Sequence, residues 1–180
     1  MRWREVCGIA SAIVLCAFGN GAQAQSPYGI GRPATPAEIA GWNIDIGRDG
    51  SNLPKGNGSV SRGREVFAQQ CASCHGEKGE GGLGDRLVGG QGTIGTAKPI
   101  RTVGSYWPYA PTLFDYIRRA MPQNAPQSLS DEDVYAVSAY VLNLNGLVGA
   151  DATLDAKSLA AVKMPNRDRF VGDARPDVKK

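Results

Sequence analysis

Residues 71–75 read Cys-Ala-Ser-Cys-His, and this pentapeptide constrains the chain more than any other feature of its sequence. Two cysteines three positions apart, followed directly by a histidine, form the attachment motif of covalently bound haem. One helical turn presents both thiols to the vinyl groups of a single porphyrin, and the histidine faces the iron from the same side. The motif therefore predicts one haem c, attached at Cys71 and Cys74, with His75 as an axial ligand of the iron.

Two other interpretations of the motif are weaker. A zinc site needs about four protein ligands, but beyond residue 24 the chain has only two cysteines and one histidine. A thioredoxin-like dithiol is expected within a strand–helix–strand pattern, and no such pattern surrounds residue 71. Both alternatives are therefore less favoured than haem.

The second axial ligand is expected to be a methionine. His75 is the only histidine, so this chain supplies no second imidazole, and beyond residue 24 its methionines are Met121 and Met164. Met121 precedes a proline and follows a predicted helix, which directs its thioether across the porphyrin, whereas Met164 lies in a polar tail. We expect Met121 to bind the iron; Met164, an open site and simple core packing of the methionine are the alternatives.

Methionine opposite histidine raises the haem potential and fills the sixth coordination position. The ligand set therefore predicts outer-sphere electron transfer. A free electron shuttle to a terminal oxidase remains an alternative, as does a haem enzyme or gas sensor with an open sixth site.

The first 24 residues have the pattern of a secretory signal peptide. Arg2 and Arg4 precede a short apolar run over 6–18, and small residues form a cleavage site that ends at Ala24. The run is shorter than the ~20 residues that span a bilayer, so a retained anchor is the weaker alternative. The sequence predicts a periplasmic protein, cleaved near Ala24, with no membrane span in its mature form.

Composition and charge narrow the function further. The formal net charge of the whole chain is +3, and it is near +2 without the leader, because Arg2, Arg4 and Glu5 contribute +1. This charge is too small to indicate nucleic acid or a membrane surface as a partner. With 24 glycines, 11 prolines and few aromatic residues, the chain fits a small, loop-rich domain built around a cofactor.

Helix signals occur at several places along the chain. The strong signals predict a helix over 61–70 with Ser61 as its N-cap, a helix over 112–120 after Pro111, and a helix from the N-cap Ser130, with Asp133 at N3, to a stop at Gly146. Weaker signals predict a short helix from the N-cap Thr35 to about Gly41, and another near 154–162.

This order of elements resembles the class I cytochromes c. In that family the first and last helices cross near the haem edge, and the matching positions here are Gly63, Phe67 and Tyr140. The resemblance implies an all-α fold whose parts are a haem domain over 60–146, an N-terminal extension over 25–59 and a C-terminal extension over 147–180. The extensions are expected either to cover the small domain or to dock a partner.

A narrower resemblance is found in three segments, 29–39, 41–45 and 102–122, the last of which includes the run Tyr-Trp-Pro-Tyr-Ala-Pro. They are similar to the cytochrome subunits of periplasmic sulfur and sulfite dehydrogenases, in which a molybdenum subunit oxidises the substrate and passes electrons to the cytochrome. Larger members carry two haem domains, whereas this chain has one Cys-x-x-Cys-His. The resemblance implies an electron-transfer subunit that is no enzyme on its own, with a downstream cytochrome c or terminal oxidase as acceptor.

Three residues ahead of Met121 are candidate contacts of the haem propionates. Arg101 carries a positive charge, and the Tyr106 hydroxyl and the Trp107 N–H are hydrogen-bond donors. Ordinary packing beneath the loop is the alternative for all three.

Overall fold

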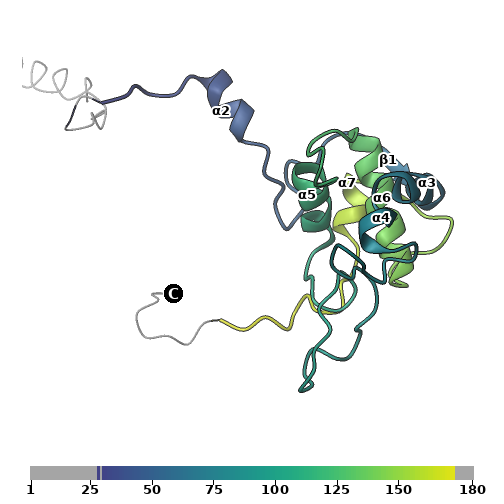
Figure 1. The fold of residues 1–180 in the computed structure, drawn as a ribbon. Coiled ribbons are helices and arrows are strands. Elements are labelled where there is room, and N and C mark those ends of the chain that lie inside the picture. Colours follow the sequence, from purple (N-terminus) through teal and green to yellow (C-terminus); the bar gives the residue numbers. More distant parts are fainter. Residues whose placement is uncertain (1–27, 29, 173–180) are drawn as a thin grey trace, which may run out of the picture. The chain divides into compact units, whose positions relative to one another are not determined.

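A computed structural model describes residue 28 and residues 30–172 (Figure 1). The predicted signal peptide lies outside these residues. The chain divides into two units, one ending at Trp42 and the other running from Asn43 onward. Their elements are, in order, α2 (Pro36–Trp42), β1 (Asn57–Ser59), α3 (Val60–Gln70), α4 (Ala72–His75), α5 (Ala110–Ala120), α6 (Asp131–Leu144), β2 (Thr153–Asp155) and α7 (Ala156–Ala160).

The described residues confirm the predicted all-α class, because six helices account for almost all their regular structure. The exception is a sheet of two three-residue strands that the sequence did not predict. β1 pairs with β2 in antiparallel register, with Gly58 opposite Leu154. None of the described helices is long and apolar enough to cross a membrane.

The N-cap of helix α3 lies two residues earlier than predicted. Its N-cap is Ser59, whose hydroxyl accepts a hydrogen bond of 3.1 Å from the backbone N–H of Arg62. The prediction of Ser61 as the cap was wrong, because the β1–β2 pair fixes the chain just before the helix and Val60 donates its N–H to Ala152. Ser61 therefore lies inside the first turn.

We expect Ser59→Ala to lower the free energy of unfolding by about 1 kcal/mol, because an orphan N–H at the start of α3 loses its acceptor. Ser61→Ala is the matched control and should change stability by less than about 0.5 kcal/mol, since this exposed residue caps nothing. Urea unfolding of the haem-loaded protein measures both, and equal losses would contradict the assignment of the cap.

Helices α3 and α6 cross at the centre of the compact unit. A Cβ atom added at Gly63 would lie 1.9 Å from the backbone oxygen of Ala136, so only glycine permits this approach. One turn further, the rings of Phe67 and Tyr140 meet edge to face with centroids 5.4 Å apart. The predicted crossing residues are thus in contact.

Helix α6 follows the sequence prediction closely. The Ser130 hydroxyl accepts a hydrogen bond of 3.1 Å from the N–H of Asp133, as expected of an N-cap. The helix ends at Leu144, and Gly146 adopts a positive φ of 70° just beyond it. The middle of the helix, from Val134 to Leu142, is buried.

Parts of both predicted extensions belong to the compact unit. Ile46 from the N-terminal side is buried in the main core, and so are several side chains from the C-terminal side: Leu154, Leu159, Val162 and Met164. The Tyr135 hydroxyl donates to the backbone oxygen of Pro54 at 2.8 Å. Residue 154 lies in β2, and the helix predicted near 154–162 is the shorter α7. These segments therefore share one hydrophobic core with the helices between them.

Candidate haem site

One cavity of the compact unit is lined by residues from α3, α5 and α6, by the residues around α4, and by the loops after α4 and before α5. Its volume is about 280 Å³, which lies close to the lower end of the range typical of ligand sites. Its apolar walls are Phe67, Leu87, Val103, Leu113, Ile117, Val137 and Val141.

The two cysteines lie on one turn at the edge of this cavity. Cys71 ends α3 and accepts hydrogen bonds through its carbonyl oxygen from the N–H groups of Cys74 and His75. The Cys71 side chain is half-buried and lines the cavity, whereas Cys74 is exposed. Burial of the Cys71 side chain, and to a lesser extent the nearby Cys74, raise the pKa of the Cys71 thiol to about 11. This upward shift disfavours a redox dithiol, because the reactive cysteine of such a pair has a lowered pKa.

The His75 ring is held by the loop that follows it. Its Nδ1 lies 2.6 Å from the backbone oxygen of Asp85, which only accepts hydrogen bonds, so Nδ1 carries the proton. The lone pair of Nε2 is then free for a metal, and such an outer partner fixes the ring and makes the imidazole a stronger donor. A Cβ at Gly84 would lie 2.9 Å from Cε1 of this ring, so the loop needs glycine there.

Met121 lies at the end of α5, where its N–H bonds to the carbonyl of Ile117. Its side chain is half-buried and lines the same cavity as His75. Met164 is only 4% exposed, belongs to the hydrophobic core and is absent from the residues that line the cavity. The structure thus brings Met121, and not Met164, to the cavity of the Cys-x-x-Cys-His turn.

The structure places only two of the three candidate propionate contacts at the cavity. Arg101 and Trp107 line the cavity, but Tyr106 does not. The Arg101 guanidinium lies 5.4 Å from the centre of the Tyr106 ring, and the Phe170 ring packs on the same ring with centroids 5.5 Å apart. Trp107 packs edge to face on Tyr116, another lining residue.

Arg86 and Asp85 are among the lining residues that the sequence reasoning missed. Arg86 lines the cavity and donates from Nε to the backbone oxygen of Glu80 at 3.1 Å. Asp85 acts through its backbone carbonyl, for which no side-chain signal exists in the sequence. An arginine soon after Cys-x-x-Cys-His was the only available signal for Arg86.

The side chains present fit a covalently attached haem. Two thiols share a turn, an imidazole has its Nε2 free, and a thioether lines the same apolar cavity together with Arg86 and Arg101. Zinc fits less well: among residue 28 and residues 30–172, no group of three or more His, Cys, Asp and Glu side chains gathers to hold a metal ion.

Comparisons with known proteins relate this chain to others of known type. The sequence profile described as cytochrome c oxidase, cbb3-type, subunit III matches residues 58–141, from β1 into α6. The thiosulfate dehydrogenase of Stutzerimonas stutzeri (strain A1501) is 31% identical over 90 residues, which are 49% of this chain and 28% of that protein. The chain thus spans well under half the length of this relative.

A solved structure covers more of the chain. It is that of the sulfane dehydrogenase SoxCD from Paracoccus pantotrophus, one chain of which is 42% identical and superposes with a TM-score of 0.76. The match covers 83% of this chain and 74% of that chain. These matches confirm the resemblance to cytochromes of sulfur-compound dehydrogenases, and the chain therefore belongs to the c-type cytochromes, the family in which haem is bound covalently.

Proposed function

We propose that this chain binds one haem c and serves in the periplasm as the electron-accepting cytochrome subunit of a molybdenum-dependent sulfur-compound dehydrogenase. The observation that carries the electron-transfer role is the shared cavity, which brings the Cys71–His75 turn and Met121 together. The 42% identity to a chain of a sulfane dehydrogenase supports the choice of partner.

The residues of the site have distinct roles in this proposal. Cys71 and Cys74 form thioether bonds to the porphyrin, while His75 Nε2 and the Met121 sulfur bind the iron. When bound, the haem supplies a one-electron Fe(III)/Fe(II) couple. Asp85 holds the His75 ring through its carbonyl oxygen.

The remaining walls of the cavity set the environment of this couple. The apolar side chains exclude water, and burial of the site is one of the means by which a protein adjusts a haem potential. Arg86 and Arg101 provide positive charge for the propionates, and Trp107 adds an N–H donor. Tyr106 contributes indirectly, by holding the Arg101 guanidinium over its ring.

The relatives support the choice of partner. In this proposal a molybdenum subunit oxidises a sulfane sulfur, the type of sulfur carried by thiosulfate, and passes electrons singly to the haem. A downstream cytochrome c or terminal oxidase then accepts them. The predicted signal peptide supports a periplasmic location, where haem is attached to Cys-x-x-Cys-His chains.

The proposal is tested by reducing the haem-loaded cytochrome under defined conditions. The catalytic subunit of the Paracoccus pantotrophus sulfane dehydrogenase is the probe, with thiosulfate and sulfite as substrates. We expect one haem per chain by mass, and reduction of the cytochrome only when subunit and substrate are both present. Reduction by substrate alone, or no reduction with both components, would contradict the proposed role.

A further inference from the structure

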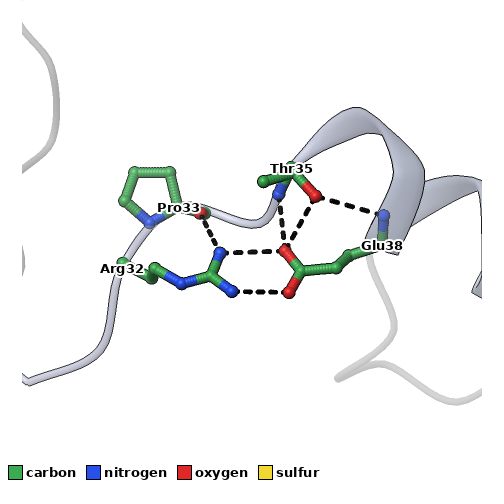
Figure 2. Close-up of polar contacts among 4 residues, drawn as sticks. All are labelled: Arg32, Pro33, Thr35 and Glu38. Carbon is green, nitrogen blue, oxygen red and sulfur yellow. Dashed lines mark hydrogen bonds and ion pairs between the residues drawn. The ribbon is translucent and has the colours of Figure 1, made fainter.

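The side chains of this chain make both local and long-range hydrogen bonds. The network at the start of α2 is local: Glu38 accepts from the Arg32 guanidinium and from the Thr35 N–H, and its own N–H donates to the Thr35 hydroxyl (Figure 2). Such a network caps one helix. The side chain of Asn145 is different, because its partners in the loop after α4 lie 56 and 58 positions away. Asn145 therefore joins segments that are distant in the sequence.

The Asn145 amide lies just beyond the end of α6 and is only 8% exposed. Its Nδ2 donates to the backbone oxygens of Leu87 and Val141, at 3.1 and 2.9 Å. Its Oδ1 accepts from the N–H of Gly89 at 3.1 Å. Two carbonyl partners on one side and an N–H on the other fix the orientation of the amide. The amide thus holds the backbone of residues 87–89 against the end of α6.

The loop before α5 meets the loop after α4 at the same place. A Cβ atom at Gly104 would lie 2.1 Å from Oδ1 of Asn145, so the backbone of this loop rests directly on the amide. The Thr102 hydroxyl donates to the backbone oxygen of Gly89 at 2.5 Å. Gly89 is thus bonded to Asn145 through its N–H and to the loop before α5 through its carbonyl.

All three segments that meet at Asn145 line the haem cavity. They contribute residues 85–87 from the loop after α4, residues 101–103 from the loop before α5, and Val137 and Val141 from α6. Asn145 itself is not a lining residue. Its influence on the site would therefore pass through the loops that it holds, which carry Arg86 and Arg101.

We propose that Asn145 is a positioning residue of the haem site, whose amide holds the two loops together and so keeps water out of the cavity and Arg86 and Arg101 beside it. The proposal rests on the proposed function and deepens it, because it assigns part of the reduction potential to a residue outside the cavity. Entry of water and withdrawal of the guanidinium groups both favour the ferric state, which carries one more positive charge than the ferrous state. Loss of the Asn145 amide should therefore lower the potential.

The test compares full-length, haem-loaded proteins that each lack one amide. Asn145→Ala removes the contacts with both loops. Asn143→Ala is the matched control, because this amide lies in the same helix but donates to the backbone oxygen of Val148, at 3.0 Å, and does not line the cavity. A redox titration measures the potential. We expect Asn145→Ala to have a lower potential than the wild type and Asn143→Ala to keep the wild-type value.

Amide hydrogen exchange of the same proteins reports on the loop directly. In Asn145→Ala the N–H of Gly89 loses its acceptor, so we expect this N–H to exchange on the order of 10-fold faster than in the wild type. Asn143→Ala should exchange at Gly89 like the wild type. Thr102→Val is a milder variant for the case that Asn145→Ala yields no haem-loaded protein, because it removes only the hydroxyl that bonds Gly89 from the other loop. It should change both measurements in the same direction, by less.

Two results would overturn the positioning role. Faster exchange at Gly89 with an unchanged potential would show that Asn145 only stabilises the fold. A higher potential would show that its loss acts through a weaker contact between His75 and the Asp85 carbonyl, and not through water and charge. Failure of the proposed function is a separate result: a wild type that takes up haem but is not reduced by the catalytic subunit and its substrate would overturn the proposed partner and leave these comparisons valid.

Discussion

Met121→Leu is expected to abolish the methionine–iron absorption band of the oxidised cytochrome and to lower its reduction potential by on the order of 0.1 V. The thioether of Met121 lines the same cavity as His75, and leucine keeps its volume but has no donor atom. Thioether ligation raises the potential, and axial ligands span about 0.8 V across haem proteins. Visible spectroscopy of the oxidised form and a redox titration measure the two effects.

Met164→Leu is the matched control for this experiment. Met164 is buried in the core, away from the cavity, so its replacement should leave both the band and the potential unchanged. The volume-conserving exchange should cost less than about 1.5 kcal/mol of stability. Loss of the band in Met164→Leu instead would make Met164 the ligand, and a wild type without the band would indicate an open sixth site.

Gly63→Ala is expected to lower the free energy of unfolding by about 3 kcal/mol or more. The added methyl group would lie 1.9 Å from the oxygen of Ala136 and 2.8 Å from Cβ of Tyr140. Because the closest atom is backbone of a buried helix, α3 and α6 must separate, which is overpacking at the centre of the core. Losses of this size arise from few mechanisms, of which this is one.

The measurement is urea unfolding of the haem-loaded protein, with Gly149→Ala as the control. A Cβ at Gly149 meets no atom within 4 Å, so this variant should be as stable as the wild type within about 0.5 kcal/mol. Wild-type stability in Gly63→Ala would show that the two helices do not approach as closely as described.

The parts of the fold that were predicted are those with strong local signals. Helix α6 has a serine cap, an acidic first turn and a glycine stop, and each is found where the sequence placed it. The N-cap of α3 was misplaced because two serines, Ser59 and Ser61, flank the start of the helix. The choice between them depends on pairing with residues 153–155, which are distant in the sequence. Three-residue strands have too few positions to show an alternating pattern.

The candidate site divides in the same way. Cys71, Cys74 and His75 form a contiguous motif, and Met121 was the better placed of two methionines, so all four were open to sequence reasoning. The sequence did not reveal that Tyr106, unlike Arg101 and Trp107, lies outside the cavity. Its position depends on Phe170 and on the Asn166 amide, which donates to the backbone oxygen of Tyr106 at 2.6 Å. Partners that lie 60 residues away leave no local pattern.

The pairing of β1 with β2 has a consequence for how this chain completes its fold. The strands stand immediately before the first core helix and shortly after the last, so Ser59 and its partner Thr153 are separated by almost the entire haem domain. Closing so long a loop is entropically costly, and contacts of this type form late in folding. The two strands join the ends of this long loop. A polypeptide cut after residue 146 would lack β2, so β1 would have no strand to pair with.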